Sequence, residues 1–375
     1  NNNNNNNNND DGVLCFPLPS QQRILLFTLL FGDAHLQQHL RVWARTASTS
    51  GVDIMIISDH DLSFPLPPHI TVLRMTYKEL VSIVSKKVFR GGRLAAIDAQ
   101  PYKIIDFKPL FGLIFAQQLK AYDFWGYLDN DQLVGNLRHV IFTDWILYNF
   151  DIVTIPLRSS FYGFTTKTTP VWGPLTLFRN TDKVNNLFRQ CKNLSAIYNN
   201  LNPMFFDEWG QETPSWDSKG FGKDPHFDLS MSKIIGDAVR NNTVRYMQHG
   251  GSAWDGMLCE GPHWKTDNVQ LRNLGNVTHG NECGKCVYTV DKKGVAQVAK
   301  FSISGVIEKV AVCHFQFGKR NIAPKLAFEI NNELMDAVLT SSSFGYTPAK
   351  GFFIPETKKK IALERKRHFL KEKHT

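Results

Sequence analysis

The sequence predicts an α/β fold in which a mixed, mainly parallel sheet is flanked by helices. Two apolar runs, at residues 23–31 and 52–59, are separated by a stretch with helical spacing, which is typical of the opening of a parallel sheet. A third run, at residues 122–128, is aromatic and ends abruptly at Asp129 and Asp131. Such sheets bind ligands at the carboxyl ends of their strands, so these two acids mark the predicted site.

The elements of the first part of the chain follow from apolar spacing and turn residues. They are, in order, a strand at 23–31, a helix at about 36–46, strands at 52–59 and 70–73, a helix at 104–119 and the strand at 122–128. The first helix places on one face Leu36, Leu40 and Trp43. The second helix is expected to pack inward Ile105, Leu113 and Leu119.

The second part of the chain is expected to complete the sheet. Its predicted elements are strands at 151–156 and 173–180, helices at 182–198 and 227–239, strands at 244–248 and 287–290, a hairpin of 301–304 with 306–312 about Gly305, and an end to the last strand near His314. The polar, Gly- and Pro-rich stretch 210–225 is predicted to be a mobile loop beside the cleft.

The 375 residues are enough for one large domain or two ordinary ones, and one large domain with additions at its end is expected. The expected division is a low-complexity N-terminus at 1–21, a main domain at 22–320 with an insert at about 250–286, an extension at 321–356 and a basic tail at 357–375. The tail supplies six of the nine net positive charges, so the charge does not indicate a nucleic-acid partner. A solvated terminus is favoured for it over an amphipathic helix in peripheral contact with a membrane.

The sequence leaves the cellular address and the cysteine chemistry open. No apolar run reaches the length of a spanning helix. The chain is therefore expected in the Golgi lumen if an anchor precedes it, and otherwise in the cytoplasm or at a membrane surface. Cys283 and Cys286 have the spacing of half a zinc site, but no second pair follows, so a local disulfide or two free thiols are favoured.

Asp129 and Asp131 are the candidate metal ligands. Side chains at positions i and i+2 of an extended segment point to the same side, so the two carboxylates are expected to share one ion. Hard oxygen donors suit Mn²⁺ or Mg²⁺, which in turn hold a diphosphate. The pair alone also fits a solvated turn after a strand. His314, after the last strand, is either structural or a third protein ligand.

Two further groups accompany this pair. Lys103, Asp106 and Lys108 are expected to project from a helix N-terminus, where they either meet a diphosphate or form a buried Asp–Lys ion pair that fastens the helix to the sheet. Asp207 and Glu208 lie in an aromatic cluster, which favours a raised pKa and a general base, although a cap or a salt bridge explains them nearly as well.

Six segments in one order give the chain a resemblance to a known family. They are 24–27 with Phe31-Gly32, 57–59, 101–109, 122–131, 173–180 and 206–208. Together they resemble a little-characterised family of glycosyltransferase-like proteins of the GT-A fold, a Rossmann-like fold, found largely in bacterial polysaccharide loci. The resemblance covers about residues 22–320. Its specific blocks are Tyr-Lys-X-X-Asp-Phe-Lys-Pro at 102–109 and Tyr-Asp-Phe-Trp-Gly-Tyr at 122–127.

The resemblance implies a metal-dependent hexosyltransferase that uses a nucleotide diphosphate sugar, a UDP-sugar, and a glycan or other hydroxyl acceptor. It maps Asp129, Asp131 and His314 to the metal, and it places near the base and ribose Thr28, Phe31 and Asp59. Asp207 or Glu208 would deprotonate the acceptor in an inverting enzyme, or only position it in a retaining one. The additions at the C-terminal end would serve the acceptor, and the insert at 250–286 does not match the family pattern.

Two other functions fit the same residues. A nucleotidyltransferase shares the sheet and the paired acids, but it usually needs a Gly-rich phosphate loop after the first strand, and residues 30–35 are not one. The second is a binding module of the same fold that has lost catalytic turnover.

Core packing, rather than stacking on sugar rings, is expected for three tryptophans, Trp125, Trp172 and Trp209.

Overall fold

The computed structural model describes residues 21–31, 37–91, 101–155, 171, 173–200, 206–207 and 229–248, together with short strands between residues 253 and 353. The expected loop at 210–225, Trp172, Glu208 and Trp209 lie outside these residues, as do the tail at 357–375 and most of the insert at 250–286. Within the described part of the chain, no helix is long and apolar enough to cross a membrane.

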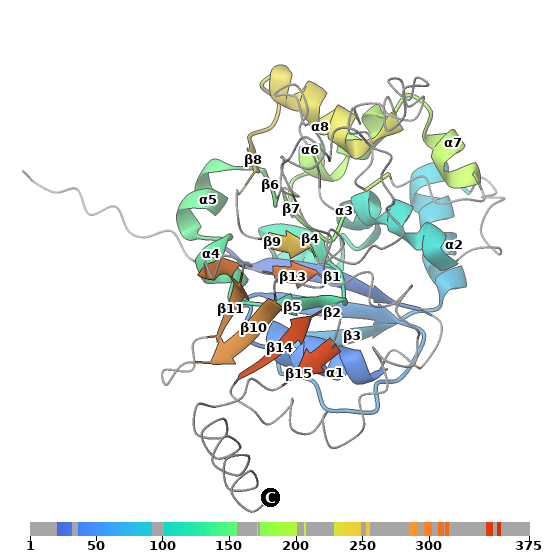
Figure 1. Cartoon of the computed structure of the whole chain (residues 1–375). Helices are drawn as coiled ribbons and strands as arrows, with labels where there is room; N and C mark the ends of the chain where they lie inside the picture. The colour runs from blue at the N-terminus through green and yellow to red at the C-terminus, as the bar shows by residue number, and fades with distance from the viewer. Residues whose placement is uncertain are drawn as a thin grey trace, which may run out of the picture.

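A seven-stranded mixed sheet forms the centre of the molecule (Figure 1). Its order is β3 (Ile70–Arg74), β2 (Asp53–Ser58), β1 (Ile24–Leu30), β4 (Phe124–Leu128), β7 (Leu175–Arg179), β6 (Ile152–Thr154) and β8 (Tyr246–Gln248). β1 runs parallel to β2 and to β4, whereas β7 runs antiparallel to β4 and β6. The predicted fold class, a mixed and mainly parallel sheet flanked by helices, is confirmed.

Helices cover both faces of this sheet. One face carries α1 (Gln37–Ala47), α4 (Leu137–Val140) and α5 (Asp144–Asn149). The other carries α2 (Tyr77–Phe89), the 3₁₀ helix η2 (Pro101–Leu110), α3 (Phe111–Ile114), η3 (Gln118–Ala121), α6 (Asp182–Asn185), η4 (Leu187–Gln190), α7 (Leu194–Asn199) and α8 (Met231–Arg240). β1 shows the division, because Leu25 and Phe27 face the second layer whereas Leu26 and Leu30 face the first.

Two smaller sheets involve the later part of the chain. A three-stranded sheet joins β5 (Gln132–Val134), β13 (Val312–His314) and β9 (Ala253–Asp255). A five-stranded sheet has the order β12 (Ile307–Val310), β11 (Ala296–Phe301), β10 (Lys285–Val290), β14 (Ser343–Thr347) and β15 (Gly351–Phe353). β11 and β12 form an antiparallel pair on either side of Gly305, as expected, but β11 shares only Phe301 with the strand expected at 301–304.

The segment expected as one helix at 104–119 is instead mostly 3₁₀. Pro109 has no N–H, and the buried apolar side chains Ile104, Phe107 and Leu110 are three residues apart, which matches three residues per turn. The expected inward face was therefore wrong in part. Leu119 is buried, but Ile105 and Leu113 are only partly buried.

The helix expected at 182–198 is also divided, into α6, η4 and α7. Asn193 begins α7 as a cap, since its Oδ1 accepts from the N–H of Ala196 at 3.1 Å. α2 was not predicted from the sequence, although a capping box begins it. Glu79 N–H donates to the Thr76 hydroxyl at 3.2 Å, and Thr76 N–H donates to the Glu79 carboxylate at 2.6 Å.

Candidate active site

The strand directions bring the predicted site residues to one edge of the sheet. Because β1, β2 and β4 are parallel neighbours, their carboxyl ends meet at the same rim. Thr28 lies near the end of β1 and is buried, Asp59 follows β2, and Asp129 follows β4. Phe31 is partly buried against the ring of Tyr77, and Asp59 is 3.2 Å from the imidazole of His60.

The acids after β4 lie in a fixed bend. Asp129 N–H donates to Pro174 O at 3.0 Å, and the indole N–H of Trp43 donates to Asp129 O at 3.1 Å. Asn130, between the two acids, donates its side-chain amide N–H to Leu29 O at 3.1 Å. Residues 130 and 131 form a bend and not a strand, so the two acids are not at positions i and i+2 of an extended segment. The Asp129 side chain is 31% exposed, whereas Asp131 is buried.

Lys108 joins this bend to a distant part of the chain. Its ammonium donates to Asp129 Oδ1 at 2.9 Å and to Gly173 O at 2.9 Å, and it lies 3.2 Å from Asp207 Oδ2. It also lies 5.2 Å from the centre of the Tyr127 ring. Burial lowers the pKa of Lys108, but the two carboxylates outweigh burial and raise that pKa well above its usual value. The ammonium is therefore charged at neutral pH.

Two backbone hydrogen bonds position Asp207 at the site. The preceding residue, Phe206, donates its N–H to Asp106 Oδ1 at 2.8 Å, and Tyr127 OH donates to Asp207 O at 3.4 Å. The Asp207 side chain is buried. Sequence reasoning selected Asp129, Lys108 and Asp207 separately, and no spacing signal could have shown that they form one cluster.

Lys103 and Asp106 form a buried ion pair, which is the arrangement that the sequence left open as an alternative. Lys103 Nζ lies 2.6 Å from Asp106 Oδ2 and donates to Ile197 O at 2.5 Å. The two side chains are 1% and 0% exposed, so neither is accessible to a diphosphate in this structure. Burial lowers the pKa of Lys103, and the charge of Asp106 offsets this in part.

Tyr198 lies over the same pair, and its substitution should give a stability change that depends on pH. Its hydroxyl donates to Asp106 O at 2.7 Å, and burial, followed by the charge of Asp106, raises the pKa of Tyr198 well above its usual value. At pH 7 we expect Tyr198→Phe to cost about 1 kcal/mol, the worth of a buried hydrogen bond. An unfolded tyrosine ionises near pH 10, so the wild type loses this advantage as the pH rises above about 10.

Urea unfolding at pH 7 and pH 11 checks this expectation. The difference in free energy of unfolding between Tyr198→Phe and the wild type should shrink or change sign at the higher pH. Tyr148→Phe, at a tyrosine that is 65% exposed, is the control and should unfold like the wild type at both pH values. A constant difference across this range would contradict the assignment.

The residue types at the rim are those that bind divalent cations in proteins. Asp129 and Asp131 supply hard oxygen donors, and the buried Gln132 Oε1 accepts no hydrogen bond from the described residues. The backbone of β13 places His314 opposite Gln132, the residue that follows Asp131. Within the described residues, however, no three His, Cys, Asp or Glu side chains are grouped so that they could hold an ion.

Trp125 packs in the core, as expected. Its ring stacks on Phe178 with centroids 4.6 Å apart, and its indole N–H donates to Asn185 at 2.6 Å. Gly126 follows it in β4, and a Cβ there would come within 2.3 Å of Thr176 O. A glycine at this position therefore lets β7 pair closely with the strand that carries the acids.

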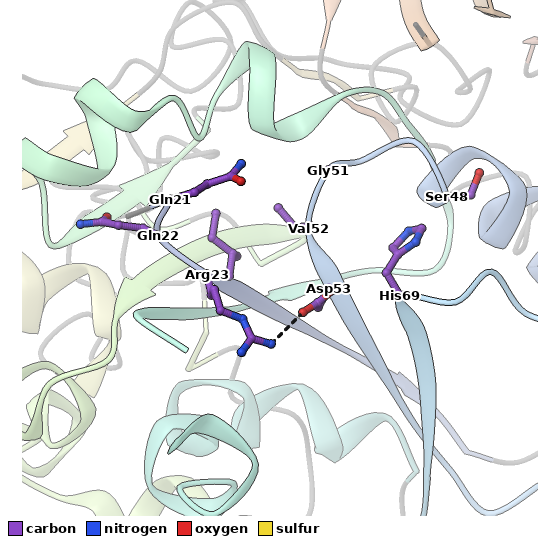
Figure 2. A pocket seen from close by; sticks show the side chains of 9 residues that line it. Gln21, Gln22, Arg23, Ser48, Gly51, Val52, Asp53 and His69 are labelled. Atoms are coloured by element: carbon purple, nitrogen blue, oxygen red, sulfur yellow. Dashed lines mark ion pairs between the residues drawn. The ribbon is translucent and has the colours of Figure 1, made fainter. Parts of the chain in front are cut away.

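A pocket of about 330 Å³ lies elsewhere, at the amino ends of β1 and β2 (Figure 2). It is lined by Gln21, Gln22, Arg23, Ile24, Ser48, Gly51, Val52, Asp53 and His69. Arg23 and Asp53 face each other across it at 3.6 Å. Because β1 and β2 begin here, the pocket is at the opposite end of the strands from Asp129 and is not part of the candidate site.

Among solved structures, the chain is similar to several glycosyltransferases. One is involved in the glycosylation of the major capsid of PBCV-1, with 9% identity over 62% of this chain and 84% of that chain and a TM-score of 0.32. The galactosyltransferase LgtC has 11% identity over 84% and 97%, with a TM-score of 0.38. Mouse xyloside xylosyltransferase 1 has 13% identity over 62% and 86%, with a TM-score of 0.34. Similarity at this level carries no information on substrate or activity.

The search of curated proteins gives no match. Residues 26–333 match the model of a family described as a family of unknown function, DUF6625. This match spans most of the 375 residues, including most of β1, the acids after β4 and β13. The chain therefore belongs to the family DUF6625.

Proposed function

We propose that the chain is a metal-dependent glycosyltransferase that moves a hexose from a nucleotide diphosphate sugar, with UDP as the nucleotide, to a glycan or other hydroxyl acceptor. One observation carries this proposal. Two carboxylates end the central strand β4 at the ligand-binding rim, and a buried lysine links the first of them to a third carboxylate, Asp207. If the ion pairs of Lys108 with Asp129 and Asp207 served only to stabilise the fold, they would not need to meet at this edge of the sheet.

Each residue then has a proposed role. Asp129 and Asp131, with His314 at the end of β13, would hold Mn²⁺ or Mg²⁺. A bound cation would supply positive charge to the diphosphate leaving group as the bond from the anomeric carbon to oxygen breaks. Thr28, Phe31 and Asp59, at the ends of β1 and β2, would lie beside the base and ribose.

The acceptor side rests on Asp207 and Glu208. In an inverting reaction one of these carboxylates takes the proton of the acceptor hydroxyl while the acceptor oxygen bonds to the anomeric carbon. Asp207 is held in position by its backbone and by Lys108, and because its side chain is buried, it would have to become accessible before it could meet the acceptor. In a retaining reaction the same pair would orient the acceptor only.

Incubation of the protein with a panel of nucleotide sugars and Mn²⁺, without acceptor, tests the proposal. We expect slow hydrolysis of one donor, with release of the nucleoside diphosphate and free sugar, loss of this activity with EDTA and its return with added Mn²⁺. Donor binding without turnover under any condition would favour a binding module. Formation of a nucleotide sugar and pyrophosphate from UTP and a sugar phosphate would instead indicate a nucleotidyltransferase.

A further inference from the structure

Lys108 is an unusual neighbour for a carboxylate that is proposed to bind a metal. Its three ammonium hydrogens have three acceptors within reach, namely Asp129 Oδ1, Gly173 O and Asp207 Oδ2 at 2.9, 2.9 and 3.2 Å. Its side chain is only 7% exposed. An ammonium with this many partners and so little access to water is a fixed part of the site rather than a mobile surface charge.

The position of this ammonium limits what Asp129 offers to a cation. One carboxylate oxygen is already engaged by Lys108, so a metal ion would use the other oxygen. That ion would then lie only a few ångströms from a positive charge. Asp207 offsets part of this charge, but it is joined to Lys108 and not to Asp129. The charge in direct contact with Asp129 is therefore one that repels a cation.

We propose that Lys108 is a built-in counter-ion that keeps the site weak for a divalent cation alone and makes tight binding depend on a diphosphate. This inference rests on the proposed function. A diphosphate brings negative charge to the rim and so offsets the ammonium, which allows cation and nucleotide to bind together with positive coupling. Without the nucleotide sugar donor, the site would therefore bind a divalent cation only weakly.

Titration of Mn²⁺, followed by the electron paramagnetic resonance signal of the free ion, tests the proposal with the metal alone as probe. In Lys108→Met we expect the nucleotide-free protein to bind Mn²⁺ at least ~10-fold more tightly than the wild type, since one positive charge a few ångströms away is removed even from a water-like medium. Added UDP should tighten Mn²⁺ binding strongly in the wild type and by a smaller factor in the variant.

Two further variants complete the experiment. Lys120→Met removes an exposed lysine and should leave Mn²⁺ affinity unchanged, which controls for total charge. Lys108→Met with Asp207→Asn removes both buried partners, so it avoids an unpaired Asp207 if the single variant fails to fold. It should still bind Mn²⁺ more tightly than the wild type, because the charge closest to Asp129 is gone.

The outcomes separate this inference from the function on which it rests. A folded Lys108→Met protein, or a folded double variant, that binds Mn²⁺ no more tightly than the wild type overturns the role of Lys108. Absence of Mn²⁺ binding in every variant, with and without UDP, overturns the metal-dependent function itself. If Asp131→Asn, added to Lys108→Met, leaves the tighter Mn²⁺ binding unchanged, the ion does not bind at Asp131. That result would overturn both the role of Lys108 and the proposed metal site.

Discussion

Replacement of Asp131 by asparagine should lower donor hydrolysis by ~10³-fold, because a carboxylate that helps to hold the cation is lost together with the charge that the cation brings to the leaving group. Asp131 is buried at the end of the bend that three hydrogen bonds to other segments hold in place. The substitution changes one atom of the side chain and leaves its volume unchanged. Hydrolysis of the best donor, measured as released nucleoside diphosphate, gives the comparison.

Asp123→Asn is the matched control for this variant. Asp123 precedes the same strand at its other end, where its carboxylate accepts from Arg23 N–H at 2.8 Å and is exposed. Its loss should leave hydrolysis within about twofold, since an exposed contact of this kind contributes little. Mn²⁺-dependent binding of UDP should disappear in Asp131→Asn alone. Equal turnover by the two variants would remove Asp131 from the proposed metal site.

Replacement of Asp106 by leucine should destabilise the fold by about 3–5 kcal/mol, because it leaves the ammonium of Lys103 buried without its carboxylate. Lys103 is 1% exposed, so water cannot replace that partner. Phe206 N–H also loses its acceptor. Urea unfolding at neutral pH measures the loss as a lower midpoint with an unchanged slope.

The double variant Lys103→Met with Asp106→Leu is the control. It removes both charges, and replacement of a buried pair by apolar groups is often close to neutral, so most of the lost stability should return. The acceptor for Phe206 stays absent, and Asp207 is the next residue. We therefore expect a stable protein whose donor hydrolysis remains impaired. Full recovery of both properties would show that Asp106 does not position Asp207.

The central strands in the first part of the sheet could be predicted because each of them contains a long apolar run. β1, β2 and β4 are buried on both faces over most of their length, which makes their sequences mainly apolar. The segment at 101–121 could not be predicted in this way. A 3₁₀ helix with Pro109 and a longer α-helix share many apolar positions, and only the spacing of three in the folded chain separates them.

The position of the site could be predicted because parallel sheets bind ligands at the carboxyl ends of their strands. The cluster of Asp129, Lys108 and Asp207 could not be predicted. Lys108 and Asp207 meet because the turn at Phe206 is held by Asp106, a contact between segments far apart in the sequence. The spacing of charged residues along the chain does not encode such contacts. Asp129, Lys108 and Asp207 could therefore be selected one by one from the sequence, whereas their contacts with one another are known only from the fold.

The pairing of β5 with β13 determines when the rim is completed during synthesis. β5 directly follows Asp131, yet its antiparallel partner ends at His314, almost half the chain later. A ribosome adds about 5–20 residues per second, so β4 and its acids leave it well before their last neighbouring strand exists. A nascent chain halted before Val312 would carry the carboxylates and Lys108 but would lack the strand that covers β5. A chain cut there would keep the central sheet's sequence while losing a border of the rim.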